Sequence, residues 1–388
     1  MNIYRVICLV CLSASSMGFS VSETGIAQNR LNPLETEIDK SDPVIPLGYQ
    51  KRELSTFEIN RIKREMAKLD RQAKAELQQG KGKAFKLWYR YLKLARAAGI
   101  ETEIDALGDV GEIAWQANRG EDLRNIANRL ITIESNETEL PTILLQLANA
   151  YEQVRYLEQA ISIYERILAN SRQQQDLVAV EDNLQTLGSL YLAQFNYSSA
   201  ADIYEQLIKA QAKSPIDPQI DVYLETLTDI YDRTEQTKRA IKTRQRLITS
   251  YETTDKANKI PQLKLAIAKD YLASNKIPQA ITAYESAFTL ATENRQLAIA
   301  NDALIDLAKL YQQEAKDKKA IAILNRLIDV QRQSYNYYGL INTYDALGKI
   351  SLQSAQKQQA KQYFQQALEL ARELDYNVNY FNNQIEKL

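Results

Sequence analysis

The chain has 388 residues, of which 45% are hydrophobic, and only 12 Gly and 8 Pro interrupt it. This composition favours a nearly all-helical fold and argues against a β-sandwich or barrel, whose many turns require more of both residues. The net charge of −1 hides an asymmetry, because residues 51–96 carry 14 Lys and Arg against 5 Asp and Glu, whereas residues 99–388 carry 31 against 39.

Residues 1–27 have the pattern of an export signal. Arg5 precedes an apolar run from Val6 to Leu12, and small and polar residues follow. The run is too short to span a bilayer, which needs about 20 apolar residues. Cleavage after Ala27 and cleavage after Ser22 both fit the pattern, and we expect an exported protein in either case.

Histidine is absent, and both cysteines, Cys8 and Cys11, lie inside the predicted signal. The mature chain would therefore lack an imidazole base, a thiol nucleophile and the usual ligands of zinc, copper and haem. We expect no catalytic site and a fold stabilised by packing alone.

Two segments precede the regular part of the sequence. Residues 28–50 are polar, contain three prolines and show no periodicity, so we expect a disordered tether. Residues 51–98 form a basic helical cap in our interpretation. Ser55 and Glu58 have the spacing of a capping box that opens a helix through Gln78. Two glycines follow, and a second helix is predicted over residues 83–98.

The basic charges of this cap lie between apolar residues at helical spacing, which is typical of a solvated amphipathic helix. A basic segment also suits anionic lipid, so peripheral membrane association through the cap is the alternative. We expect no binding of nucleic acid.

A pattern with a period of 40 residues occupies residues 101–375, in units that begin at 101, 141, 181, 221, 261, 301 and 341. Counted from 1 in each unit, position 8 is small or nearly so: Gly108, Ala148, Gly188, Thr228, Ala268, Ala308 and Gly348. Position 20 is also small: Gly120, Ala160, Ala200, Ala240, Ala280, Ala320 and Ala360. Position 11 is tyrosine in the middle five units: Tyr151, Tyr191, Tyr231, Tyr271 and Tyr311.

These spacings predict two helices in each unit. Positions 7, 8 and 11 share one face of a first helix, and positions 20, 24 and 27 share one face of a second. The small residues would let the two helices of a hairpin approach closely, and the tyrosines would fill the space between hairpins. Residues 376–388 would form a C-terminal capping tail.

One unit shows the consensus most clearly, with Leu187, Gly188, Tyr191, Ala200, Tyr204 and Leu207 at its small and apolar positions. This pattern resembles the tetratricopeptide repeat, whose usual period is 34 residues rather than 40. The resemblance implies an all-α, right-handed superhelical solenoid of antiparallel helix pairs. It also implies a concave groove, lined by first helices, that binds a protein partner or peptide segment.

A narrower resemblance involves the N-terminal block, which reads RELSTFEINRIKREMAKLD. With the following FKLWYRYLKLARAAGIETEIDALGDVGEIAWQANRGED, it is similar to exported cyanobacterial tetratricopeptide proteins of the PratA type, which assist photosystem II assembly. This resemblance implies a location in the periplasm, or alternatively the thylakoid lumen, and a role in manganese delivery or membrane-complex assembly.

Positions 2, 5, 9 and 12 of each first helix lie off the packing face and should line the groove. The candidate partner-binding residues at these positions are Asn149, Asp182, Gln185, Ser189, Glu225, Asp229, Lys269, Lys309 and Lys349. The three lysines share position 9 and would form a basic column that suits an acidic peptide. The carboxylate clamp of chaperone-binding relatives is incomplete, because Leu145 replaces a required basic residue.

Two first helices carry carboxylates at spacing 0, +4 and +7, which places each trio on one helix face. The trios are Asp105, Asp109 and Glu112, and Glu225, Asp229 and Asp232. Oxygen-only clusters favour hard cations such as manganese or calcium. The alternative is an ordinary solvated acidic face.

The segment GDVGE, from Gly108 to Glu112, would form two small helix contacts rather than a nucleotide site. The sequence therefore predicts a non-catalytic interaction scaffold. The alternatives are a divalent-metal binding protein and, third, a hydrolase that uses paired carboxylates.

Overall fold

The computed structural model describes residues 32–36, 42–46, 48–49, 52–80, 83–136, 141–211 and 218–388. Its described residues form seventeen α-helices and one short 3₁₀ helix, η2 (Ala257–Lys259), so the all-helical prediction is confirmed. None of these helices is both long and apolar enough to cross a bilayer. The predicted signal of residues 1–27 lies outside the described residues.

The chain divides into two compact units, one ending at Tyr156 and one beginning at Leu157. The helices of the first unit are α1 (Thr56–Gln78), α2 (Ala84–Ala98), α3 (Ile100–Gln116), α4 (Gly120–Asn136) and α5 (Pro141–Gln153). Within the first unit α1 packs on α2, α2 on α3, and α3 on both α4 and α5. The predicted helical cap and the first repeat therefore have the expected helix pairs.

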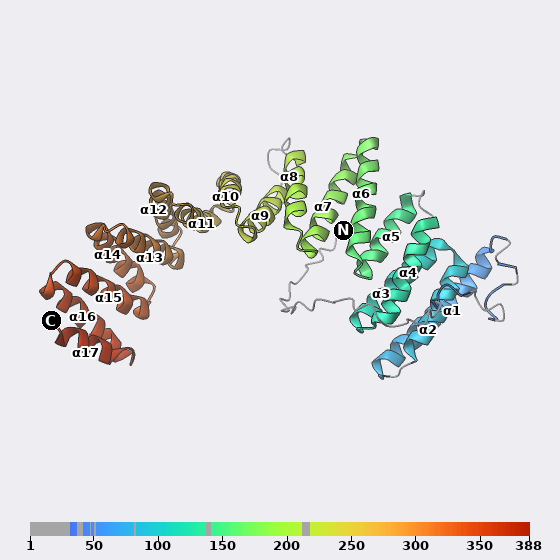
Figure 1. Ribbon diagram of the computed structural model, residues 1–388, viewed down its shortest axis with the longest axis horizontal. Helices are drawn as coiled ribbons and strands as arrows, with labels where there is room; N and C mark the ends of the chain where they lie inside the picture. The colour runs from blue at the N-terminus through green and yellow to red at the C-terminus, as the bar shows by residue number, and fades with distance from the viewer. Residues whose placement is uncertain are drawn as a thin grey trace, which may run out of the picture. The chain divides into compact units, whose positions relative to one another are not determined.

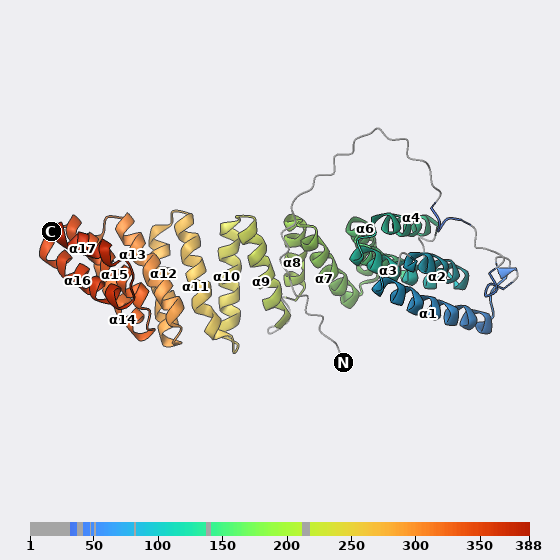
Figure 2. The same ribbon diagram turned by 90° about the horizontal axis from the view of Figure 1, so that it is seen from below.

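The second unit is a run of helices that follow one another in chain order (Figures 1 and 2). They are α6 (Leu157–Gln174), α7 (Leu177–Ala193), α8 (Tyr197–Gln211), α9 (Pro218–Arg233), α10 (Thr237–Glu252), α11 (Ile260–Ala273), α12 (Ile277–Glu293), α13 (Leu297–Gln313), α14 (Asp317–Gln333), α15 (Tyr337–Gln353), α16 (Lys357–Glu373) and α17 (Val378–Glu386). Each helix packs on its neighbour in sequence, as a solenoid requires.

The capping box at the start of α1 is present as predicted. The Ser55 hydroxyl accepts a hydrogen bond from the Glu58 backbone N–H, and the Glu58 carboxylate accepts one from the Ser55 backbone N–H at 2.9 Å. These two bonds satisfy donors that would otherwise be unpaired at the helix start. Arg52 pairs with the same carboxylate at 2.6 Å.

A repeated left-handed residue ends each first helix of the second unit. The φ angle lies between 52° and 59° at all five of these positions, which are Phe195, Glu235, Asn275, Ala315 and Ala355. In each case the following residue donates its N–H to the carbonyl at position 11, as Asn196 does to Tyr191 at 2.9 Å. This is the Schellman arrangement, which closes a helix and reverses the chain. None of the five is a glycine, although the φ angle favours one.

The small residues at the repeat positions allow close helix packing, as predicted. A Cβ on Gly188 would lie 3.1 Å from the Tyr204 ring, and a Cβ on Gly348 would lie 2.6 Å from the Phe364 ring. In the first unit, a Cβ on Gly111 would lie 2.2 Å from Val154, the residue that follows α5. The GDVGE segment is therefore a helix contact. Gly120 departs from the pattern, because it is exposed at the start of α4.

The position-11 tyrosines join neighbouring hairpins by a contact that sequence analysis did not foresee. The Tyr191 hydroxyl donates to Glu165 at 2.5 Å, Tyr231 donates to Glu205, and Gln245 donates to Tyr271 at 3.4 Å. In these three pairs the partner occupies position 25 of the preceding unit, whereas Tyr151 donates to Glu134 at position 34. Burial, followed by the bond to Glu165, raises the pKa of Tyr191 to about 12.

Two parts of the segment predicted as a disordered tether pack against the first unit. Leu34 and Ile45 are only 4% and 8% exposed, and polar contacts hold the residues around them to α2 and α4. The prediction of a disordered tether does not hold for residues 32–36 and 42–46, because Leu34 and Ile45 are buried against helices. The C-terminal tail forms α17, which packs on α16 through the buried Phe381.

Candidate partner-binding surface

The exposed face of the first helices carries the residues predicted for a groove. Position 9 is exposed in every unit, from Asp109 and Asn149 to Lys349, whereas positions 7 and 8 are buried throughout. This alternation follows from the helix period, since positions 9 and 8 are about 100° apart around the axis. The sequence therefore predicted the outward face of these helices correctly.

A cavity of about 360 Å³ opens on this face of the second unit, between α13 and α15. Its volume is within the range of small-ligand and side-chain pockets. The apolar part of the lining is Ile305, Ala308, Leu324, Leu327 and Ala346. The polar part is Lys309, Gln312, Gln331, Asn342 and Thr343.

A buried hydrogen-bond network fixes the cavity floor. The Thr343 hydroxyl donates to the Gln331 side-chain carbonyl at 2.8 Å, and the Gln331 amide donates to Asn301 at 3.1 Å. Gln331 is 1% exposed, so its amide would be costly to leave unpaired. These bonds connect α13, α14 and α15 and hold the walls at a fixed separation.

Gly339 makes room for this network. A Cβ at that position would lie 2.7 Å from the Gln331 amide nitrogen and 2.6 Å from that of Asn336. Sequence analysis missed this residue, although a signal was present: the same position in the three preceding units is Gln219, Lys259 and Ile299. The single glycine in that column marks the one unit where a buried amide approaches the helix start.

Lys309 lies at the rim of the cavity and differs from the other two position-9 lysines. Lys269 lies 3.5 Å from Asp306, and Lys349 lies 2.6 Å from Asp345. Within the described residues no carboxylate lies within 4 Å of the Lys309 ammonium group. The predicted basic column is therefore uneven, with one lysine available for a partner's carboxylate.

The C-terminal helix covers the last groove position. The Tyr380 hydroxyl donates to Asp345 at 2.8 Å, and the Lys349 ammonium lies 5.6 Å from the centre of the Tyr380 ring. The side-chain hydrogen bond to Asp345 is the main cause that raises the pKa of Lys349. Lys349 thus holds α17 in place in this structure.

The remaining predicted groove residues lie on α5, α7 and α9. Asp182 and Ser189 are exposed, and Gln185 is half-buried with its amide 3.3 Å from Glu181. Asn149 is an exposed residue of α5 in the first unit. The cavity beside α2, the cavity between α11 and α12 and the cavity between α13 and α15 contain none of these side chains in their linings.

The predicted metal ligands are distributed along their helices. Within the described part of the chain, no three Asp or Glu side chains come close enough together to hold an ion. In the second trio each carboxylate has a cationic partner: Lys259 lies 3.1 Å from Glu225, Arg233 lies 2.7 Å from Asp229, and Arg244 contacts Asp232 at 2.5 Å.

The first trio is less neutralised. Asp105 accepts a hydrogen bond from Gln146 at 3.3 Å, and Glu112 accepts one from Gln116 at 3.2 Å. Burial, and then repulsion from Asp105, raises the pKa of Asp109. Metal binding by either trio stays a prediction of the sequence.

Comparison with known families matches residues 143–178 and 299–373 to tetratricopeptide-repeat profiles. The second match includes both first helices that line the cavity. These segments are tetratricopeptide repeats. The rest of the resemblance proposed from sequence, to assembly factors of the PratA type, is not supported by these matches. A comparison with curated proteins finds no match to this sequence.

Several solved structures resemble parts of the chain. BtubC from P. vanneervenii is 17% identical, with a TM-score of 0.37 over 56% of this chain and 92% of its own. A MamA protein is 19% identical, with a TM-score of 0.36 over 50% and 92%. The C-terminal part of a tetratricopeptide-repeat protein from Cytophaga hutchinsonii is 13% identical, with a TM-score of 0.40 over 68% and 95%.

Proposed function

We propose that the protein is a non-catalytic scaffold that binds an extended peptide segment of a partner protein at the cavity between α13 and α15. The observation that carries this proposal is the cavity itself, which opens on the first-helix face within a pair of tetratricopeptide repeats. Repeats of this kind present such faces to protein partners. The lining contains no Asp or Glu, so it lacks the paired carboxylates of the hydrolase alternative.

The lining also defines the chemistry of the segment. Ile305, Leu324 and Leu327 offer an apolar surface to one side chain of the partner, which would lose contact with water on binding. Lys309 at the rim would pair with a carboxylate a few residues away on the same segment. We therefore expect an apolar residue close to Asp or Glu in the bound sequence.

Selection from a library of 12-residue peptides displayed on phage tests this proposal with the full chain as target. Enriched sequences should share an apolar residue near an acidic one, and their binding should fall at least tenfold in the Lys309→Glu variant. Lys318→Glu on α14 is the matched control, since it removes an exposed lysine from a second helix. Enrichment of peptides that bind both variants equally would contradict the proposal.

The location of this binding is a further part of the proposal. A secretory leader in residues 1–27 would place the scaffold outside the cytoplasm, where it would assist assembly of a membrane complex, as its resemblance to photosystem II assembly factors suggests. N-terminal sequencing of the protein purified from its own cell would test this. A mature chain that begins near residue 23 or 28 is expected, and a chain that retains residues 1–22 would contradict export.

A further inference from the structure

A second surface, in the first unit, is occupied by the chain's own N-terminal residues. Residues 32–36 and 42–46 have no helix or strand, yet they lie against α2 and α4. Leu34 and Ile45 are the apolar anchors of the two segments, with 4% and 8% of their surface exposed. The helices are the second members of their hairpins, so this face is distinct from the first-helix groove.

The first segment contacts both helices through polar groups. On α4, the Asn125 carbonyl accepts a hydrogen bond from Asn32 at 2.8 Å, and Arg129 lies 3.4 Å from the Glu35 carboxylate. On α2, Arg96 donates to the Leu34 carbonyl at 3.2 Å. A backbone turn, closed by the Glu35 N–H donating to the Asn32 carbonyl at 2.9 Å, and one carboxylate are therefore recognised together.

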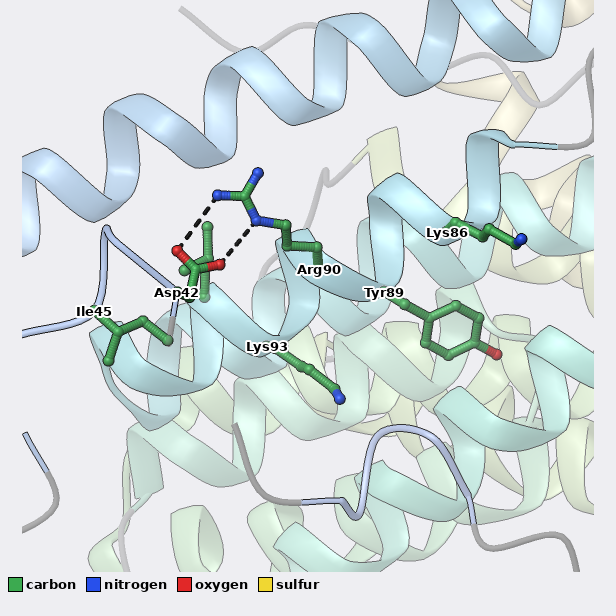
Figure 3. Close-up of a pocket in the computed structure, with 7 residues that line it drawn as sticks. Asp42, Ile45, Lys86, Tyr89, Arg90 and Lys93 are labelled. Atoms are coloured by element: carbon green, nitrogen blue, oxygen red, sulfur yellow. Dashed lines mark hydrogen bonds and ion pairs between the residues drawn. The ribbon is translucent and has the colours of Figure 1, made fainter. Parts of the chain in front are cut away.

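The second segment presents another carboxylate to α2. Arg90 holds Asp42 through two guanidinium nitrogens, with the shorter contact at 2.8 Å (Figure 3). Arg90 also lies 3.2 Å from Glu65 of α1, which fixes the guanidinium in position. The bond to Asp42 is the first cause that raises the pKa of Arg90.

A cavity of about 270 Å³ remains beside this contact. Asp42 and Ile45 form one side of it, and Lys86, Tyr89 and Lys93 project from α2 on the other (Figure 3). The Lys93 ammonium also donates to the Thr36 hydroxyl at 2.8 Å. The N-terminal residues thus leave part of the available basic surface unfilled.

Charge supports recognition between the two parts. Residues 32–46 contain four carboxylates and one lysine, whereas α2, which holds Asp42, carries four basic residues and no acidic one. The two segments are joined to their own receptor by the chain, so their local concentration is high. In each ion pair one side chain, Arg90 or Glu35, is at least a third exposed. Pairs open to solvent contribute only about 0–1 kcal/mol each, so a competing segment can replace them.

We propose that the face of α2 and α4 around Arg90, Lys93 and Arg129 is a binding surface for an acidic, turn-forming segment of a partner protein. Residues 32–36 and 42–46 occupy this α2–α4 face within the chain and compete with the partner for it. The partner segment would carry an apolar residue beside a carboxylate, as Leu34 and Glu35 do, and a second acidic residue farther along.

A fluorescent peptide with the sequence of residues 32–46 is the probe for this surface. It would be titrated into the full chain and into a variant with Leu34→Ser and Ile45→Ser, which removes both anchors from the intramolecular segment. We expect the peptide to bind the variant at least tenfold more tightly than the unaltered chain, because its site is vacated. A second release variant, Glu35→Lys with Asp42→Lys, should behave in the same way.

Specificity would be measured in the Leu34→Ser and Ile45→Ser background. Arg90→Glu should weaken peptide binding at least tenfold, whereas Arg71→Glu, an exposed residue of α1, should leave it unchanged. Circular dichroism at 222 nm would verify that each variant keeps its helices.

Three results would overturn the proposal. The first is that the peptide binds the unaltered chain and both release variants with equal affinity. The second is that it shows no saturable binding to either release variant. The third is that Arg90→Glu does not change its affinity. Sedimentation would detect a fourth: a dimer of the unaltered chain that Arg90→Glu dissociates would assign the surface to a second copy instead.

Discussion

Replacing Gly348 by alanine tests the close approach between the two helices of the last repeat. The new Cβ would lie 2.6 Å from the Phe364 ring, which is fully buried and cannot move aside. Overpacking of this kind costs about 1–3 kcal/mol. Alanine in place of glycine inside a helix returns about 1 kcal/mol. We therefore expect a net loss of about 1 kcal/mol of unfolding free energy.

Gly188→Ala is the matched control at the same repeat position. There the Cβ would lie 3.1 Å from the Tyr204 ring, which is 8% exposed and can shift by a few tenths of an ångström. The unit beginning at residue 261 already has Ala268 at this position together with Tyr284. Helix propensity should then dominate, and the variant should be about as stable as the unaltered chain or slightly more stable.

Urea unfolding followed by circular dichroism would give the overall difference, and hydrogen exchange in α15 and α16 would localise it, since repeats can open separately. Combining Gly348→Ala with Phe364→Leu should reduce the cost of the added methyl group, because the ring that it meets is gone. The reasoning is refuted if Gly348→Ala is no less stable than Gly188→Ala.

Three further predictions concern stability. Burial and a carboxylate partner raise the pKa of Tyr191 to about 12, against about 10 in the unfolded chain. The free energy of unfolding should therefore fall as pH rises from about 10 to 12, and thermal melts across that range should show a smaller fall for Tyr191→Phe. Ala315→Gly should raise the free energy of unfolding by about 0.5 kcal/mol, because alanine is strained at the left-handed φ of 52°. Ala169→Gly, at an exposed position inside α6, should lower it by about 1 kcal/mol. An equal loss in both variants would exclude strain at Ala315. Burial and repulsion from Asp105 raise the pKa of Asp109, so Asp109→Asn should raise the melting temperature at pH 7 but not below about pH 3.5. If Mn²⁺ raises the melting temperature of the unaltered chain but not that of this variant, the result would instead support the metal prediction.

The periodic part of the fold was predictable from the sequence because its information is local. Gly188 and Ala200 at fixed positions specify a close helix pair, and the Ser55–Glu58 spacing specifies a helix start. The segment around Leu34 was not predictable in the same way. Proline and polar residues surround it, and its contacts with α4 involve residues more than 90 positions away.

The candidate site could be predicted only in part. Exposure of Lys309 follows from the helix period, but the cavity beneath it depends on how far apart α13 and α15 are held by Gln331. Lys349 and Asp345 are four residues apart on one helix, so their pairing follows from the helix period. Their contacts with Tyr380 were not predictable, because these depend on how α17 packs. The repeat period predicts which residues share a helix face, whereas the partners of those residues depend on side-chain geometry.

Peptide affinity in two phenylalanine variants tests most directly whether the cavity between α13 and α15 is the binding site. Ala346→Phe fills the cavity from α15, and Ala322→Phe adds the same ring to the exposed face of α14. With a peptide selected on the unaltered chain, fluorescence anisotropy should show at least a tenfold loss of affinity for Ala346→Phe and no change for Ala322→Phe. Equal affinity of both variants for that peptide would contradict a binding site in this cavity.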